Sequence, residues 1–577
     1  MSNPLQKSLE EAFVEVTAPG EDMAVEEEEI RGVRYQVFKN YSITLRDLYQ
    51  RSLAEFQDQP FVVYEELRWT FAETGQQAAQ FAEVLHEQFS VQKGDRVAIA
   101  MRNYPEWLVS FMAITSLGAI VVPMNAWWTT KELEYGLEDS GSVVVVVDQE
   151  RLERLAPLIG HKPFRVIAVR CEDPLPEPVT SYEQMMAGRR EQTLPEVAID
   201  PDEDALLMYT SGSTGFPKGV ISTHRSVIFP LVSWKVLTLV QAMVDGIDLL
   251  NPDPDAYPPT VLVTSPLFHA AALHGQFLLS LFFGAKAVLM YKWDAEKALA
   301  LIENERITYF NGVPTMSWEM LRSPNFEKYD LSSLHFIVGA GQARPPEHVK
   351  HFEERLPGYR VATGWGLTET NAIGSTNSRA EYVQKPASVG MPHPLAFLKI
   401  VDEHNQEVAV GESGEVLIKS AANARGYWNQ PEATAQAFQE GWFRTGDIGY
   451  LDQEGFLYIV DRAKDIVIRG GENISCLEVE AAIYQHPAVL EAAVFGIPEE
   501  RLGEAVYAVV MVRPKTPIDA AALQTFLQER LASFKIPQYF EFRTDPLPRT
   551  GTEKIHKRQL REEMLAKVQK SAGKGGT

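Results

Sequence analysis

Five consecutive valines, at positions 143–147, constrain the fold of this chain more than any other stretch. An uninterrupted β-branched run is typical of a strand that is buried on both faces, as in parallel sheets covered by helices. The flanking sequence alternates helix and strand patterns in the order of parallel βαβ units: a helix at 78–88, a strand at 97–101 and a helix at 130–137. The sequence therefore predicts an α/β fold with parallel βαβ layers.

The pattern of helix and strand signals changes at residue 388 and again at residue 466. Between 388 and 420 short strands alternate with turns, which indicates a small β-rich subdomain. After 466 helix and strand patterns mix over about a hundred residues, a usual size for a compact α+β domain. We therefore expect four segments: a loosely ordered acidic segment at 1–32, a large domain at 33–461, a small domain at 466–568 and a disordered tail at 569–577.

Charge and cysteine content exclude several classes of function. The formal net charge of −24 makes nucleic acid and anionic lipid surfaces poor partners. Cys171 and Cys476 are too few and too far apart to build a disulfide framework or a zinc site. The first residues lack a signal pattern, and polar residues interrupt the longest apolar stretch, at 107–124. We expect a cytoplasmic protein without a transmembrane segment.

A run of hydroxyl and glycine residues, Y-T-S-G-S-T-G-F-P-K-G at 209–219, follows a short apolar strand pattern. Glycines let backbone N–H groups turn toward an anion, hydroxyls add donors, and the lysine adds positive charge. Pro217 stands where a Walker loop requires glycine, so this is a different phosphate cradle, with a solvated linker as the alternative. The candidate phosphate-binding residues are Thr210, Ser211, Gly212, Ser213, Thr214, Gly215 and Lys218.

A second glycine-rich element, T-G-W-G-L-T-E-T, occupies residues 363–370. Its glycines admit a flat ring close to the backbone, its tryptophan can stack or wall a pocket, and its Thr-Glu pair offers oxygens suited to Mg²⁺. The alternative is a glycine-rich turn with a surface glutamate. The candidate residues are Gly364, Trp365, Gly366, Thr368 and Glu369.

Both elements resemble signature motifs of the adenylate-forming, or AMP-binding, superfamily, which contains acyl-CoA synthetases, luciferases and peptide synthetase adenylation domains. The first matches T-S-G-S-T-G-x-P-K-G, and W-G-L-T-E at 365–369 matches the family's Y/W-G-x-T-E. Five motifs stand in the family order between about Leu45 and Lys557. The resemblance implies a large AMP-binding domain and a mobile C-terminal domain that use ATP, Mg²⁺ and coenzyme A.

The resemblance also implies roles for residues of the large domain. Thr368 would contact phosphate, and Glu369 would hold the metal ion. Asp447, at the end of G-W-F-R-T-G-D, would accept hydrogen bonds from the ribose hydroxyls. The acyl group would lie beside three residues, His269, Gly339 and Trp365. Further contacts to ATP or AMP would come from Gly341, Gln342, Gly364, Trp365 and Gly366.

The C-terminal motifs imply a second set of roles. D-R-A-K-D at 461–465 resembles the junction between the domains, so Arg462 is expected to contact the nucleotide and Lys464 to be the pivot of a hinge at 462–465. Lys554 falls in register with the family's catalytic lysine and would act together with Lys218, Thr368 and Glu369. The loop expected to face coenzyme A comprises Arg469, Gly470, Gly471 and Glu472.

Two places depart from the family pattern. Glu553 stands where the family has glycine, and its carboxylate can pair with Lys554 or oppose an anionic substrate. Gln342 and Arg344 replace parts of the usual Gly-Gly-Ala-Pro step, so the shape of the pocket cannot be carried over from relatives.

The chemistry implied by these residues is the activation of a carboxylic acid. Two unit charges 4 Å apart repel by about 4 kcal/mol at an effective dielectric near 20, so a carboxylate that attacks a phosphate needs positive charge. The sequence predicts an ATP-dependent carboxylic acid:CoA ligase that makes an acyl-adenylate from a medium- or long-chain fatty acid. The alternatives are CoA ligases for aryl or other non-fatty acids, luciferase-like oxidases, adenylation enzymes that serve a carrier-protein thiol, and catalytically silent binding scaffolds. Peripheral membrane contact and a homodimer stay open.

Overall fold

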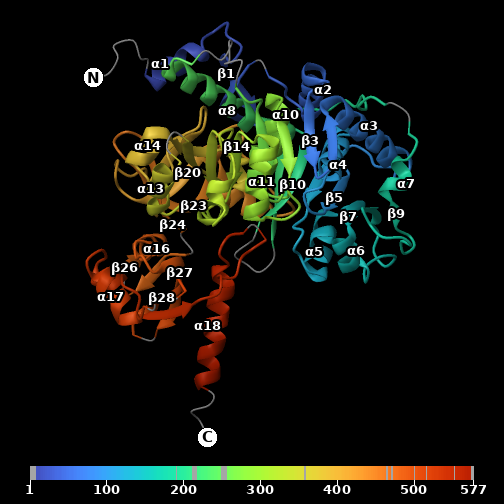
Figure 1. The fold of residues 1–577 in the computed structure, drawn as a ribbon. Helices are drawn as coiled ribbons and strands as arrows, with labels where there is room; N and C mark the ends of the chain where they lie inside the picture. The colour runs from blue at the N-terminus through green and yellow to red at the C-terminus, as the bar shows by residue number, and fades with distance from the viewer. Residues whose placement is uncertain are drawn as a thin grey trace.

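The computed structural model describes most of the chain. The described residues are 8–39, 41–189, 192–210, 217–247, 256–342, 344–356, 359–462, 465–469, 472–499, 501–514, 516, 518–551 and 553–572. They form a large lobe and a smaller C-terminal lobe, which is orange to red in Figure 1.

The valine run lies inside the first sheet of the large lobe. β7 (Val144–Asp148) is buried along its whole length and pairs in parallel with both of its neighbours. The predicted α/β fold with parallel βαβ layers is therefore confirmed. Across the described residues this sheet runs in the order β21 (Gly426–Tyr427), β11 (Lys218–Thr223), β10 (Asp204–Thr210), β6 (Ile120–Pro123), β5 (Arg96–Ala100), β7, β8 (Arg165–Val169) and β9 (Thr180–Ser181).

The second sheet has six neighbouring parallel strands, from β3 to β16, flanked by antiparallel strands. Since parallel strands end at the same edge, their loops meet on one side of the sheet. Its described strands run in the order β18 (Met391–Pro392), β17 (Gly374–Ser378), β16 (Arg360–Gly366), β15 (Phe336–Ala340), β14 (Tyr309–Gly312), β12 (Thr260–Val263), β13 (Lys286–Leu289), β3 (Pro60–Tyr64) and β4 (Leu67–Thr70).

Helices fill the space between the two sheets. α4 (Pro105–Ser116) is buried at every residue and packs against strands of both sheets, and Pro105 occupies its first turn, where a missing N–H costs nothing. Within the described chain, α8 (His224–Asp245) is the one helix that is long and apolar enough to cross a membrane. Because 56% of its apolar window is buried inside the protein, this is weak evidence for a membrane span.

The large lobe contains twelve further α-helices among its described residues between Leu45 and Ala437. Their bounds are α2 (Leu45–Phe56), α3 (Phe71–Glu87), α5 (Thr130–Ser140), α6 (Gln149–Leu155), α7 (Tyr182–Met186), α9 (Ala270–Ala272), α10 (Leu279–Phe283), α11 (Ala295–Glu305), α12 (Pro314–Arg322), α13 (Pro346–Arg355), α14 (Arg379–Gln384) and α15 (Pro431–Ala437).

The predicted β-rich region is an antiparallel sheet of short strands. Its described strands are β19 (Phe397–Val401), β20 (Gly414–Lys419), β22 (Phe438–Gln439), β23 (Trp442–Leu451) and β24 (Leu457–Arg462). The C-terminal lobe is a sheet with helices, formed by β25 (Val467–Arg469), β26 (Glu472–Ile474), α16 (Cys476–Tyr484), β27 (Val489–Glu499), β28 (Gly503–Val512), α17 (Ala520–Gln528), β29 (Tyr539–Arg543) and α18 (Lys557–Ala572).

Both ends of the described chain are more ordered than the sequence predicts. The segment expected to be loose contains α1 (Leu9–Val16) and β1 (Val25–Ile30), which pairs with β2 (Val33–Phe38). The physical reason is that α1 packs against α8, while Glu28 of the acidic run pairs with Arg225 at 2.7 Å. At the other end α18 continues to Ala572, inside the segment predicted to be a disordered tail.

Candidate active site

The two ends of the predicted phosphate cradle face each other across a strand pair. Thr210 ends β10, Lys218 begins β11, and the two residues are direct partners in the antiparallel register. The Lys218 ammonium lies 5.1 Å from the ring centroid of Tyr427. Five residues assigned to the cradle lie outside the described chain: Ser211, Gly212, Ser213, Thr214 and Gly215.

Glu369 lies in a short 3₁₀ turn directly after β16 and is held by the segment that leads into β21. Its Oε1 accepts a hydrogen bond from the Tyr427 hydroxyl at 3.0 Å, and its carbonyl accepts one from Ala424 N at 2.8 Å. Burial raises the pKa of the Glu369 carboxyl. Tyr427 thus touches both Lys218 and Glu369, two residues that the sequence motifs identified separately.

Sequence reasoning missed Tyr427. Gly426-Tyr427 alone is typical of a turn, and no charged or nucleophilic group marks it. Its place is set by the pairing of β21 with β11, where Val220 is the partner of Tyr427. A pairing between strands about two hundred residues apart leaves no local signal, so only the tertiary structure reveals this neighbour.

Asp447 lies on β23 and is almost fully buried, at 3% exposure. Its Oδ2 accepts a hydrogen bond from Trp365 Nε1 at 2.8 Å, and its Oδ1 lies 3.1 Å from Arg462 Nε on the neighbouring strand β24. Three residues that the sequence assigned to the nucleotide therefore contact one another. The glycine beside Trp365 is required here, because a Cβ on Gly366 would lie 2.4 Å from the Ala372 carbonyl oxygen.

Lys554 reaches the large lobe from the C-terminal lobe. It belongs to a tight turn that an isolated β-bridge between Arg549 and Ile555 closes, with Thr550 N donating to the Lys554 carbonyl at 2.7 Å. Gly341, directly after β15, has a φ of +78°, and a Cβ built on it would lie 3.2 Å from Lys554 Nζ. Burial, together with the smaller effect of the Arg462 charge, lowers the pKa of Lys554 to about 8.

His269 lies close enough to this lysine for the ammonium charge to affect its pKa. Burial is the main cause that lowers the pKa of His269 to about 3, and Lys554 adds to it, so the imidazole is neutral at physiological pH. Its Nε2 is buried without a hydrogen-bond partner in the described structure. A buried ring nitrogen of this kind is free to bind a polar group of a substrate.

The loop after β15 differs from the pattern of relatives. Gln342 has a buried Oε1 without a described hydrogen-bond partner, so an acceptor is available there. Arg344 is 5% exposed, and a Cβ on Gly339 would lie 2.5 Å from its Nη2. Gly339 is therefore needed to accommodate the arginine, a packing role that the sequence did not suggest.

Glu553 is held through its backbone. Its φ of +62° lies in the left-handed region, which explains why glycine suits this position. Its N–H donates to the Thr550 carbonyl at 3.0 Å, and its carbonyl accepts from Arg549 Nη1 at 3.0 Å. Among the described residues no ion pair joins its carboxylate to Lys554, and the charges that act on it are those of Arg549, Glu319, Lys292 and Arg102.

The two described residues among those assigned to coenzyme A, Arg469 and Glu472, contact each other within the small lobe. Arg469 and Glu472 are partners in the hairpin of β25 and β26, and the charge of Arg469 acts on Glu499 of the same lobe. Gly470, Gly471 and the predicted pivot Lys464 lie outside the described residues. Among the described residues, the structure therefore joins Lys218 and Glu369 through Tyr427, Asp447 to Trp365 and Arg462, and Lys554 to Gly341, and it keeps Arg469 and Glu472 in the small lobe.

Comparisons with known proteins identify the family of this arrangement. The AMP-binding enzyme family model matches residues 49–428, and the AMP-binding enzyme C-terminal domain model matches residues 478–554. A long-chain-fatty-acid–CoA ligase of Bacillus subtilis is 33% identical over 551 residues, which cover 90% of this chain and 94% of that protein. A feruloyl-CoA synthase of an Amycolatopsis species is 35% identical over 492 residues, 85% of this chain and 93% of that protein.

Solved structures agree with these relatives. The o-succinylbenzoate coenzyme A synthetase from Bacillus subtilis, in complex with ATP and magnesium ion, superposes with a TM-score of 0.73 at 30% identity. The match covers 89% of this chain and 98% of that one.

Proposed function

This chain belongs to the family of AMP-binding enzymes and is an adenylate-forming CoA ligase, and we propose that its acid substrate is a medium- or long-chain fatty acid. The observation that carries the assignment of the site is the Lys554 ammonium of the small lobe beside Gly341 of the large lobe. We propose that the carboxylate and the phosphate meet beside this cation, which would offset the repulsion between them. The near-complete match to a long-chain-fatty-acid–CoA ligase supports the choice of acid.

Mg²⁺ suits the residues present, and ATP would carry it into the site. No group of three or more His, Cys, Asp or Glu in the described chain could hold a metal by itself. Mg²⁺ is commonly bound by one or two carboxylates plus substrate phosphates, and Glu369 supplies one half-buried carboxylate. We assign the ion to Glu369, with Thr368 at the phosphate, where it would offset negative charge on the reacting phosphate.

The remaining groups act on the nucleotide and the acid. Lys218 and the 210–215 cradle would hold the leaving pyrophosphate, and the free Oε1 of Gln342 suits the adenine amino group. Asp447 would bind the ribose, exchanging its bonds to Trp365 and Arg462 for the hydroxyls. His269 would position the attacking carboxylate as a neutral donor, since a base is not required for an acid that is already ionised.

The second step needs the thiol to enter where Lys554 now lies. We propose that the small lobe turns at the 462–465 hinge, with Lys464 as pivot, and presents the loop at 469–472 to coenzyme A. Arg469 and Glu472 are held in a hairpin of that lobe, so they would move with it as a unit.

An aromatic acid is the second candidate, because the feruloyl-CoA synthase is as similar to this chain as the fatty-acid ligases are. The bulky apolar residues of the large lobe do not decide between the two. Phe229 and Phe277 belong to one buried cluster and Phe310 to another, where all three contribute to the core.

An acid panel tests the proposed substrate. Acid-dependent ATP–pyrophosphate exchange and CoA-dependent AMP release would be measured with medium- and long-chain fatty acids, hydroxycinnamic acids and benzoic acids. We expect kcat/KM to be at least about tenfold higher for the best fatty acid than for any aromatic acid, a difference of about 1.4 kcal/mol in transition-state binding. A reversed preference would establish the aryl-acid alternative.

The pH dependence of the first step follows from Lys554. Because burial lowers the pKa of Lys554 to about 8, the required ammonium is present below that pH and is lost above it. We expect kcat/KM for pyrophosphate exchange to fall about tenfold per pH unit on the alkaline side. Lys554→Arg keeps its charge and should give a slower but flat alkaline profile. An alkaline limb that survives in this variant would assign the titration to another group.

Tyr427→Phe tests the contact between the two motifs. The change removes the hydroxyl that donates to Glu369 and keeps the ring beside Lys218. A hydrogen bond to a charged group contributes about 1.5–3 kcal/mol, so we expect a loss of about tenfold in pyrophosphate exchange and a higher Mg²⁺ requirement. Tyr450→Phe, on a half-buried pair of stacked rings in the β-rich sheet, is the matched control. Equal activity in both variants would show that the hydroxyl is dispensable.

A further inference from the structure

The turn that carries Lys554 meets the large lobe on the face of one indole. We define the Lys554 turn as residues 549–551 and 553–555, and the Trp127 loop as residues 125–128. A Cβ built on Gly551 would lie 2.6 Å from Cε3 and 2.7 Å from Cδ2 of Trp127. Because carbon atoms in contact are about 3.5–4.0 Å apart, the Gly551 backbone lies directly on the indole, with no room for a side chain.

Other residues hold the indole in this position. The Arg102 guanidinium carbon lies 4.0 Å from the Trp127 ring centroid, and the Phe268 ring packs edge-on at 5.4 Å. Phe268 in turn lies 4.7 Å from the ring of His269. Trp127 is thus located between the Lys554 turn and the side chains assigned to the acid.

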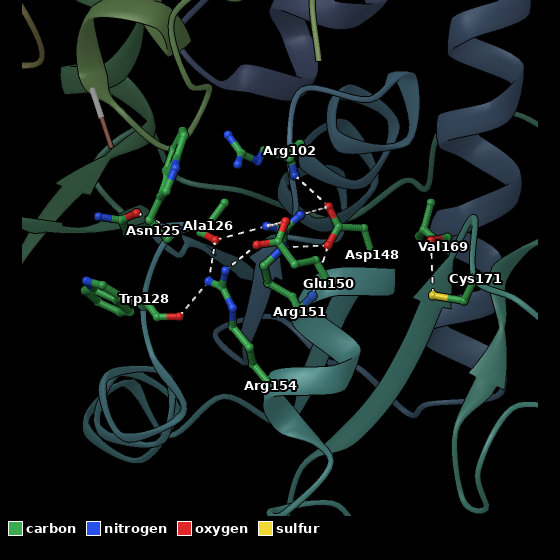
Figure 2. Close-up of polar contacts among 11 residues, drawn as sticks. Arg102, Asn125, Ala126, Trp128, Asp148, Glu150, Arg151, Arg154, Val169 and Cys171 are labelled. Carbon is green, nitrogen blue, oxygen red and sulfur yellow. Dashed lines mark hydrogen bonds and ion pairs between the residues drawn. The ribbon is translucent and has the colours of Figure 1, made fainter. Parts of the chain in front are cut away.

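A dense polar network fixes the Trp127 loop (Figure 2). Arg151 and Arg154 both donate to the Ala126 carbonyl, at 3.1 and 2.9 Å, and Arg154 also donates to the Trp128 carbonyl at 2.9 Å. Trp127 N donates to Asn125 Oδ1 at 2.9 Å. Carbonyls on both sides of Trp127 are therefore bonded to arginines, which leaves the loop little freedom to follow a moving partner.

Asp148 connects this network to the residue stacked on the indole. It accepts a hydrogen bond from Arg102 N at 3.0 Å and forms a buried ion pair with Arg151, whose side chain is 0% exposed (Figure 2). The backbone of Arg102 and the Trp127 loop are thus fixed to one carboxylate. The buried pair of Asp148 and Arg151 is costly to disturb, so the Trp127 loop and the backbone of Arg102 form a rigid support for the indole.

Two polar contacts between the described residues of the Lys554 turn and the large lobe are weak. Thr315 Oγ1 donates to the Glu553 carbonyl at 3.4 Å, and Arg549 lies 3.6 Å from Glu319. Long hydrogen bonds and partly exposed ion pairs contribute little to docking. A large aromatic face is the strongest contact available to the turn.

We propose that Trp127 is a positioning residue for the adenylate-forming step: its indole is the platform on which the Lys554 turn docks, so that the ammonium reaches Gly341. The proposal rests on the proposed function. It identifies a residue of the large lobe that favours adenylate formation, the first of the two proposed reaction steps. Since Lys554 must leave for the thiol to enter, the platform contributes to adenylate formation and not to thioester formation.

Three variants test the platform. Trp127→Ala removes the indole, Gly551→Ala adds a methyl group that clashes with it, and Trp127→Phe keeps a flat ring. With dodecanoic acid, we expect pyrophosphate exchange to fall about tenfold or more in the first two variants and less than about threefold in Trp127→Phe. Conversion of supplied dodecanoyl-AMP by coenzyme A should stay within about twofold of the unaltered enzyme in all three. Equal losses in both steps would overturn the proposal.

Hydrogen exchange of the ligand-free protein separates failure of this proposal from failure of the proposed function. Trp127→Ala and Gly551→Ala should speed exchange at the amides of Thr550 and Glu553, which the docked turn bonds internally, and leave the β27–β28 amides of the same lobe unchanged. This readout needs no substrate. Unchanged protection of the turn in both variants would refute the platform even if the enzyme is active, and faster exchange without ligase activity would refute only the function.

Discussion

Lys554→Ala is expected to slow acid-dependent ATP–pyrophosphate exchange by about a hundredfold to a thousandfold, equivalent to about 3–4 kcal/mol. The lysine is the cation of the small lobe that lies beside Gly341, and burial makes its charge act through a medium of low dielectric. Removing it leaves the repulsion between carboxylate and phosphate without that compensation. Thioester formation from a supplied acyl-adenylate should change far less, because the lysine is not needed once the adenylate exists.

The control for this variant is Lys567→Ala. Lys567 lies on α18 of the same lobe, with a side chain 61% exposed, so its loss changes the net charge equally and leaves the site intact. It should exchange pyrophosphate at the rate of the unaltered enzyme. If Lys554→Ala kept full exchange activity, the ammonium beside Gly341 would have no part in the reaction.

Glu369→Gln is expected to reduce the first step by about a hundredfold at ordinary Mg²⁺ concentrations. The amide keeps the shape of the side chain and can still accept the hydrogen bond from Tyr427, so the change is confined to the charge. A carboxamide is a much weaker Mg²⁺ ligand than a carboxylate, and activity should recover partly as Mg²⁺ is raised. A titration of exchange rate against Mg²⁺ measures this shift.

Thermal unfolding distinguishes loss of metal binding from loss of fold. Burial raises the pKa of Glu369, so its ionised form opposes folding, and the associated stability is lost as pH rises through the folded-state pKa. At neutral pH the neutral glutamine removes that cost, and Glu369→Gln should unfold no earlier than the unaltered protein. Glu432→Gln, an exposed charge in the first turn of α15, is the control. A variant with an unchanged Mg²⁺ requirement would reassign the metal carboxylate.

The parts of the fold that follow local rules could be predicted from the sequence. The valine run had to be a buried strand, and Pro105 had to begin a helix, because each pattern has one low-cost conformation. The N-terminal segment was misjudged because a row of glutamates carries no sign of its partners. Arg225 and α8, which hold that segment in place, are about two hundred residues away along the chain.

The difference between local sequence patterns and contacts distant in the chain also applies to the candidate site. Motifs in single stretches identified Glu369, Asp447 and Lys554, and the structure places Lys554 beside Gly341. Tyr427 and Trp127 could not be predicted, because contacts outside any motif set their positions. The pairing of β21 with β11 positions Tyr427, and hydrogen bonds from arginines position the loop of Trp127. Aromatic side chains are also common in ordinary cores, so their residue type alone says little about a site.

The last two residues of β24, Asp461 and Arg462, are bonded to different lobes. Asp461 accepts a hydrogen bond from Cys476 N, at the start of α16 in the small lobe, while its neighbour Arg462 holds Asp447 of the large lobe. The side chains of two consecutive residues, Asp461 and Arg462, thus contact different lobes. A rotation of the small lobe would act on the strand whose Arg462 contacts Asp447, so we expect the position of the lobe to affect the site proposed for the ribose.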